Sequence, residues 1–226
     1  MQILVTNDDG YLAPGLDTLF RLASRFGEVY VVAPETEQSY MGHRVTAGTQ
    51  DLVATPFADR AFHVNGTPAD CVRAALHILK LQPDLVLSGI NRGGNLGVDI
   101  YTSGTVAAAR EAAIWGLPAV AFSQYVKREL PLDWSHSEAL AAQALETLIA
   151  QAPQPGVYWN VNLPHMPTPE AAIAVCAPDP SPQDVRYTPS DTGHRYTGTY
   201  AKRPAKPGHD VANCFAGRIT ISRLLL

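Results

Sequence analysis

The chain has 226 residues, of which 46% are apolar, and a formal net charge of −4 at pH 7. This length and composition allow one sizeable hydrophobic core and argue against general disorder. The acidic balance and the lack of a long basic run argue against a nucleic-acid polymer as partner, and no apolar segment is long enough to span a bilayer.

The first predicted strand, Ile3–Thr6, is followed at once by Asn7, Asp8, Asp9 and Gly10. In open α/β sheets, ligands bind outside the carboxyl ends of the strands. Two adjacent carboxylates at such a place repel each other, and a divalent cation would remove that cost. The alternative is a simple turn made by Asp9 and Gly10, with Asp9 capping the next helix. Because the pair ends a first strand, the sequence favours a ligand site.

Strand-like and helix-like segments alternate through the first 150 residues. The further predicted strands are 29–32, 62–64, 84–88 and 119–123, and the predicted helices are 15–26, 67–79, 105–115 and 137–149. Gly27 is expected to end the first helix, and Thr67 with Pro68 to begin the second. This repeating order predicts an α/β fold with a doubly wound, mostly parallel, Rossmann-like sheet.

The composition changes after about residue 151, where Pro, Gly, Tyr and Thr become frequent. We therefore expect an α/β core at 1–150, which carries the metal and phosphate site, and a C-terminal extension at 151–226 that completes the same domain. The strands predicted in this extension are 158–161, 173–176 and 218–222. Residues 181–209 have weak apolar periodicity, which fits a mobile loop. Their tyrosines, Tyr187, Tyr196 and Tyr200, fit a β-rich arm or hairpin equally well.

The three cysteines, Cys71, Cys176 and Cys214, lie far apart and form no C-x-x-C motif. Neither a disulfide framework nor a zinc site is therefore expected, and we interpret them as packing residues. The sequence begins with a predicted core strand, not with a charged segment followed by an apolar one. Together these features predict a cytoplasmic protein that does not engage a membrane.

Oxygen-bearing side chains occur in the three loops that follow the strands ending near residues 6, 32 and 88. The carboxyl ends of parallel strands lie at one edge of a sheet, so these loops should converge. Asp8, Asp9, Ser39 and Asn91 offer carboxylate, hydroxyl and amide oxygens, the ligands that Mg²⁺ and Mn²⁺ prefer. Asn91 and Ser39 are also ordinary loop residues, so the residue pattern by itself assigns only the two aspartates.

A phosphate site is predicted beside the acidic loop. The segment Gly93–Asn95 is flexible and can present amide N–H groups to an anion. Ser103, Gly104 and Thr105 precede a predicted helix, whose positive N-terminus would bind phosphate. The alternative is simple capping of that helix by Ser103 or Thr105. The sequence contains neither a Walker A loop nor a G-x-G-x-x-G fingerprint after its first strand.

Four blocks of the sequence carry most of these residues. They are LVTNDDG at 4–10 with APG at 13–15, NGTPADCV at 65–72, SGINRGGNLG at 88–97 and SGTVAAARE at 103–111. In content and order they resemble the SurE family (survival protein E). The resemblance implies a metal-dependent phosphatase that acts on nucleoside 5′- and 3′-monophosphates, with one divalent cation, Mg²⁺ or Mn²⁺, per subunit.

The resemblance also implies roles for particular residues. The metal ligands of the family correspond to Asp8, Asp9, Ser39 and Asn91. Residues 181–209 correspond to the part that forms the oligomer, which implies a homodimer or homotetramer. After the serine ligand the family commonly has glycine, and this chain has Tyr40 there, which is expected to line or narrow the pocket.

We therefore expect hydrolysis of a phosphomonoester, with nucleotides as substrates and polyphosphate as a further candidate. Asp8 or Asp9 would orient the attacking water or accept its proton. The phosphoryl group would be held by Asn95, Ser103, Gly104 and Thr105. A phosphoaspartyl mechanism ranks lower, because no lysine is placed at a strand end to neutralise the intermediate.

Two alternatives come from other classes of protein. The first is a non-catalytic sensor that binds metal and nucleotide, but a receiver-like module needs an aspartate after a middle strand, where this chain has Ser88 and Gly89. The second is an assembly protein that works through residues 181–209. That interpretation leaves the acidic loop unexplained.

Overall fold

A computed structural model describes residues 1–48, 50–127, 129–166, 168, 170–183 and 185–226. In chain order the elements are β1 (Gln2–Thr6), α1 (Pro14–Ala23), β2 (Glu28–Pro34), β3 (Ala54–Ala58), β4 (Ala61–Val64), α2 (Pro68–Arg73), the π-helix η1 (Ala74–Ile78), β5 (Leu85–Arg92), the 3-10 helix η2 (Gly97–Tyr101), α3 (Gly104–Ile114), β6 (Ala119–Gln124), α4 (Trp134–Ile149), β7 (Val157–Leu163), β8 (Ile173–Val175), β9 (Tyr187–Ser190), β10 (Gly193–Tyr196), the 3-10 helix η3 (Tyr200–Lys202), α5 (Asp210–Phe215) and β11 (Ile219–Leu225).

The centre of the fold is a nine-stranded sheet in the order β3-β4-β2-β1-β5-β6-β7-β11-β8. The six strands from β4 to β7 are parallel to their neighbours, whereas β3 and β11 run antiparallel to β4 and β7. Strands buried on both faces read as nearly continuous apolar runs, which is why β1, β2 and β5 were visible in the sequence. The predicted α/β, mostly parallel architecture is confirmed.

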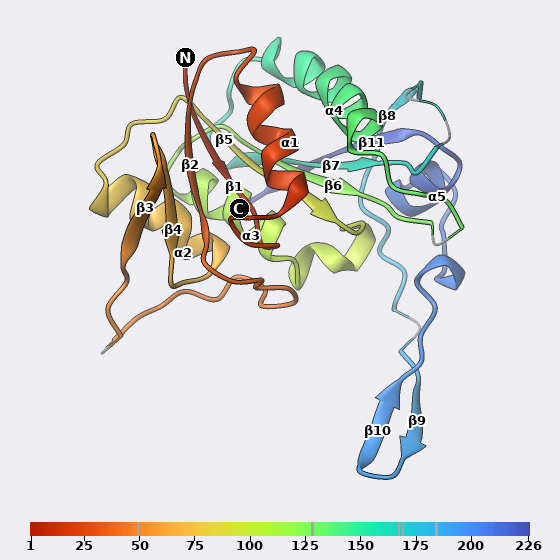
Figure 1. The fold of residues 1–226 in the computed structure, drawn as a ribbon. Helices are drawn as coiled ribbons and strands as arrows, with labels where there is room; N and C mark the ends of the chain where they lie inside the picture. Colours follow the sequence, from red (N-terminus) through yellow and green to blue (C-terminus); the bar gives the residue numbers. More distant parts are fainter. Residues whose placement is uncertain (49, 128, 167, 169, 184) are drawn as a thin grey trace.

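Helices cover both faces of this sheet (Figure 1). On one face α1 and α4 pack against a core that includes Leu19, Phe122 and Leu145. On the other face α2 and α3 pack against a second core with Leu4, Val86 and Val106. Alternate residues of each strand therefore pack into opposite cores. The loops that follow the parallel strands lie at the carboxyl edge of the sheet.

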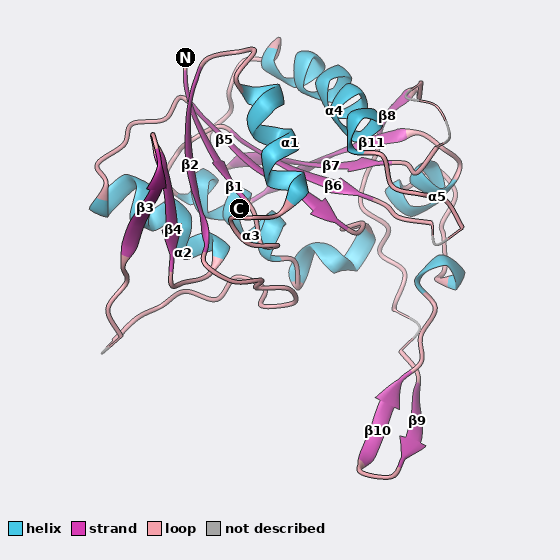
Figure 2. Cartoon of the chain, in the orientation of Figure 1, coloured by secondary structure: helices cyan, strands magenta, loops and turns pink. Residues whose placement is uncertain are grey.

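Residues after 150 supply three strands to the same sheet and one separate hairpin. Strand β11 lies between β7 and β8, so the chain ends inside the sheet. The β9–β10 hairpin extends away from the body of the molecule (Figure 2), and every residue of its two strands is exposed. Residue 184, within the predicted arm at 181–209, lies outside the described residues.

Two helix ends differ from the sequence-based prediction. Helix α1 ends at Ala23 with Ser24 as its C-cap, not at Gly27. Gly27 serves close packing instead, because a Cβ there would lie 2.1 Å from the carbonyl oxygen of Met1. Helix α4 begins at Trp134, since Asp133 caps it by accepting a hydrogen bond from the backbone N–H of Ser135.

The start of α2 follows its predicted capping signal. Thr67 and Asp70 form a reciprocal capping box, and Pro68 occupies the first turn. None of the helices formed by the described residues combines the length and apolar character needed to cross a bilayer.

Candidate active site

Asp8 is buried where β1 ends, against the first turn of α3. Its carboxylate accepts hydrogen bonds from the backbone N–H of Thr105 at 3.1 Å and from the Thr105 hydroxyl at 2.5 Å. A Cβ at Gly104 would lie 2.9 Å from the Cβ of Asp8, so only glycine permits this approach. Burial raises the pKa of Asp8 to about 6 and the charge of Asp9 adds to this, while the Thr105 hydrogen bonds lower it.

Asp9 is fastened to the loop that follows β5. The backbone N–H of Arg92 donates to its carboxylate at 3.0 Å, which places Asp9 next to Asn91. Burial raises the pKa of Asp9, and the negative charge of Glu37 acts in the same direction. The side-chain amide of Asn91 donates to the carbonyl oxygen of Gly93 at 2.9 Å.

The loop after β2 also contacts the acidic pair. The backbone N–H of Gln38 donates to the carbonyl oxygen of Asp8 at 2.7 Å. Ser39 follows and donates its hydroxyl to the Glu37 carboxylate at 2.6 Å. Tyr40 has a left-handed backbone, with φ 60, and its side chain is 88% exposed. The structure thus brings Asp8, Asp9 and the Ser39 loop to one edge of the sheet.

The predicted phosphate donors at the start of α3 already have partners within the chain. The hydroxyl of Ser103 accepts a hydrogen bond from the backbone N–H of Val106 at 3.1 Å, which makes Ser103 the helix N-cap. Thr105 is engaged with Asp8. Helix capping and phosphate binding would use the same residues, so the role of Ser103 and Thr105 in binding a ligand stays a prediction.

Asn95 is held by the sheet. Its side-chain amide donates to the hydroxyl of Ser123 at 2.7 Å, and its backbone N–H donates to the side-chain oxygen of Asn162 at 2.8 Å. Its carbonyl oxygen accepts from the side-chain amides of Asn160 and Asn162 at 2.8 and 3.1 Å. These hydrogen bonds therefore fix the loop after β5 to strands β6 and β7.

Sequence reasoning missed a polar band on the sheet face beneath α3. Strand register places Ser88, Ala121, Asn160 and Ser222 in one row. The side-chain oxygens of Ser88, Asn160 and Ser222 are buried and, among the described residues, have no hydrogen-bond partner. The signal was present as asparagines at alternate positions of β7, within an otherwise apolar strand.

A further buried oxygen lies beside the acidic pair. The side-chain oxygen of Asn7 is buried and has no partner in the described part of the chain. The described residues contain no group of three or more His, Cys, Asp or Glu that could hold a metal ion. Any cation at this edge would therefore depend on amide and hydroxyl oxygens in addition to the two aspartates.

Comparisons with known proteins agree with this architecture. Residues 3–181 match the family model "Survival protein SurE". A protein of Nostoc sp. is 43% identical over 99% of both chains. Proteins named 5′-nucleotidase SurE are 39% identical in Paramagnetospirillum magneticum, over 99% of this chain and 89% of that one, and 40% identical in Deinococcus radiodurans, over 92% and 74%.

Solved structures give the same result. The crystal structure of the SurE protein from Aquifex aeolicus superimposes with a TM-score of 0.87 and 30% identity, covering 100% of this chain and 93% of that one. The fold and these relatives define an α/β enzyme of the phosphatase class. The chain belongs to the SurE family.

Proposed function

We propose that this protein is a metal-dependent phosphomonoesterase that hydrolyses nucleoside 5′- and 3′-monophosphates to a nucleoside and phosphate. The observation that carries the proposal is the buried Asp8, held against the N-terminus of α3 where three loops meet. The relatives named 5′-nucleotidase supply the substrate class. Polyphosphate is a second candidate substrate of the same site.

Asp8, Asp9, Ser39 and Asn91 would hold one Mg²⁺ or Mn²⁺. The donor set fits such a cation, because burial raises the pKa of both aspartates and leaves their charges poorly stabilised by the protein alone. The hydrogen bond to Gly93 uses the amide nitrogen of Asn91 and leaves its oxygen as the metal-binding atom. When bound, the cation would neutralise both carboxylates and activate a water.

The chain's own groups would then position the substrate. Asp8 or Asp9 orients the attacking water or accepts its proton. Asn95, Ser103, Gly104 and Thr105 surround the phosphoryl group, whose developing charge the N-terminus of α3 stabilises. The backbone N–H of Thr105 donates to Asp8 in this structure, so a phosphoryl group at the N-terminus of α3 would compete with Asp8 for this donor.

The proposal includes a homodimer or homotetramer formed through residues 181–209. Tyr187 and Tyr196 are 61% and 56% exposed and contact each other edge-on at 5.8 Å. Aromatic residues on an exposed hairpin pack readily on a second subunit, and exchange of such an arm is a low-cost route to a dimer.

A phosphate-release assay tests the proposal. The protein is treated with a chelator, and Mg²⁺, Mn²⁺, Ca²⁺ or Zn²⁺ is restored separately against nucleoside 5′-monophosphates, 3′-monophosphates and polyphosphate. Mg²⁺ or Mn²⁺ should restore activity on both nucleotide classes, since oxygen ligands suit hard cations. Undiminished release after exhaustive chelation would contradict the metal dependence, and release from neither nucleotide class would contradict the substrate.

A further inference from the structure

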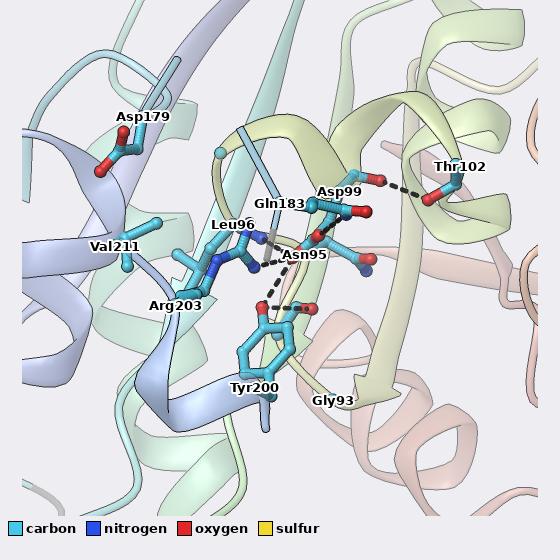
Figure 3. A network of polar contacts seen from close by, with 12 residues as sticks. Gly93, Asn95, Leu96, Asp99, Thr102, Asp179, Gln183, Tyr200, Arg203 and Val211 are labelled. Carbon is cyan, nitrogen blue, oxygen red and sulfur yellow. Dashed lines mark hydrogen bonds and ion pairs between the residues drawn. The ribbon is translucent and has the colours of Figure 1, made fainter. Parts of the chain in front are cut away.

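The base of the projecting arm is hydrogen-bonded to the loop after β5, which belongs to the candidate phosphate site. The hydroxyl of Tyr200 lies 3.0 Å from the carbonyl oxygen of Gly94 and 2.8 Å from a carboxylate oxygen of Asp99 (Figure 3). Gly94 directly precedes Asn95, and Asp99 lies in η2, between that loop and α3. One arm residue thus contacts both ends of segment 94–99.

Asp99 connects this segment to residues on both sides of the hairpin. Arg203 forms an ion pair with the same carboxylate, and its guanidinium lies 4.8 Å from the ring centre of Tyr200. Gln183, which precedes β9, donates to the second carboxylate oxygen at 2.7 Å. The side chains of Arg203 and Asp99 are only 8% and 13% exposed, so the pair is less screened by solvent than a surface pair.

The Tyr200 hydroxyl keeps its proton under ordinary conditions. Burial raises the pKa of Tyr200 well above its usual range, and the charge of Asp99 raises it further. A phenol carries one proton, so the hydroxyl donates to Gly94 or to Asp99 at any one time, and the charged Asp99 carboxylate is the stronger acceptor. The same carboxylate accepts from the backbone N–H of Leu96 at 3.3 Å, so Tyr200 is linked to the loop through Asp99 as well as by its contact with Gly94.

The loop is enclosed between the arm and the sheet. A Cβ at Gly94 would lie 3.0 Å from the Tyr200 hydroxyl on one side and 3.6 Å from the side-chain oxygen of Asn162 on the other. Asn95 is bonded to β6 and β7 by its side chain and backbone. The sheet fixes Asn95, and Tyr200 fixes the residue before it.

We propose that Tyr200 is a positioning residue for the reaction, because its hydroxyl sets the backbone of the loop that would receive the phosphoryl group. This inference rests on the proposed function. It divides the arm into two parts: an exposed hairpin at 187–196, and a foot, Tyr200–Arg203, that serves the site of its own subunit.

The test removes one oxygen atom. Tyr200→Phe keeps the ring beside Tyr125 and Phe215 and loses the hydroxyl. Because one hydrogen bond is lost, amide hydrogen exchange at 93–97 should rise roughly tenfold. The KM for a nucleoside 5′-monophosphate and the inhibition constant of inorganic phosphate should rise roughly five- to tenfold, with a smaller change in kcat. Asp99→Asn should act in the same direction.

Tyr187→Phe is the matched control, since Tyr187 packs on Tyr196 in the hairpin, and it should change none of these quantities. Unchanged exchange at 93–97 in Tyr200→Phe would overturn the positioning role. Faster exchange with unchanged phosphate inhibition would overturn its connection to the reaction. If the unsubstituted protein hydrolyses no nucleotide, the proposed function fails, and calorimetric titration with inorganic phosphate then decides whether Tyr200 shapes an anion site.

Discussion

At the scale of single residues, the two neighbouring aspartates have different surroundings. Asp8 is buried and accepts two hydrogen bonds from Thr105, whereas Asp9 is less buried and accepts one from the backbone N–H of Arg92. Burial is the main reason that the pKa of each is raised. The protein therefore holds the Asp8 carboxylate in place, and the Asp9 carboxylate is the more accessible one for a ligand.

Asp9→Ala should abolish turnover and leave the fold intact. Loss of a cation ligand removes several kcal/mol of transition-state stabilisation, so kcat should fall roughly 1,000-fold or more. Removal of a charge beside Asp8 relieves repulsion, so the metal-free protein should melt at an equal or higher temperature. Phosphate release and thermal denaturation measure both effects. Asp59→Ala, at an exposed ion pair, is the control; a folded Asp9→Ala protein with near-normal kcat would refute the assignment.

Residue patterns predicted that the acidic pair follows β1, because an apolar run ends just before it. They could not predict that Thr105 would bond to Asp8 or that Ser103 would cap α3. A serine or threonine before a helix serves a cap and an anion equally well. Which of these two roles applies depends on how closely α3 approaches β1, and Gly104 permits the close approach seen here.

At the scale of elements, Glu111 joins α3 to its neighbours. Its buried carboxylate accepts hydrogen bonds from His43 at 2.7 Å, Arg73 at 2.7 Å and Trp115 at 2.8 Å. His43 belongs to the segment between β2 and β3 that also carries Ser39, and Arg73 ends α2. One side chain therefore fixes the Ser39 segment and α2 against α3.

Glu111→Gln should destabilise the protein by about 3 kcal/mol at pH 7, because it breaks a buried charged cluster. Burial alone would raise the pKa of Glu111, but hydrogen bonds from His43, Arg73 and Trp115 outweigh it and lower the pKa to about 2. This stabilisation is complete above pH 4.5, the ordinary value, and is lost as the pH falls toward 2. Urea denaturation at pH 7, 4 and 3 should therefore show the difference between variant and wild type shrinking.

Glu138→Gln provides the comparison, since Glu138 pairs with Arg21 at the surface, and such a pair contributes less than about 1 kcal/mol. An equal loss in both variants, or a Glu111→Gln effect that does not change with pH, would contradict the assigned role of Glu111.

Strong apolar runs predicted the parallel strands, while weaker elements were not recognised. Strand β3 has four exposed residues of five and contains Pro56, so it lacks an alternating pattern. Helix α5 has six residues, too few to show helical periodicity. Strand β5 continues past Gly89 to Arg92, although glycine usually indicates the end of such a run.

At the scale of the whole molecule, the β9–β10 hairpin projects away from the body (Figure 1). The backbone N–H of Thr197 donates to the carbonyl oxygen of Arg186 at 2.9 Å, so these residues lie side by side at its base. A chain in which residues 187–196 are deleted and Arg186 is joined to Thr197 should become monomeric and keep the Tyr200 contacts.

Light scattering at micromolar concentration measures this change, and Asp59→Ala, outside the arm, is the control. A monomeric intact protein, or an unchanged oligomer after deletion, would contradict the proposed arm exchange. Sequence composition predicted an arm or hairpin at 181–209. It could not place β11, because strand order depends on pairing between segments far apart in the chain.

The placement of β11 has a consequence for the order in which the sheet can assemble. Strands β1 to β7 can pair without β11, whereas β8 must wait, because its partner in the sheet is β11. Strand β11 then enters between two strands that precede it in the chain. Until it does, one edge of β7 is unpaired, and β7 carries Asn160 and Asn162, the residues that fix Asn95. A folding intermediate without β11 would therefore hold the candidate phosphate loop on an unprotected edge strand.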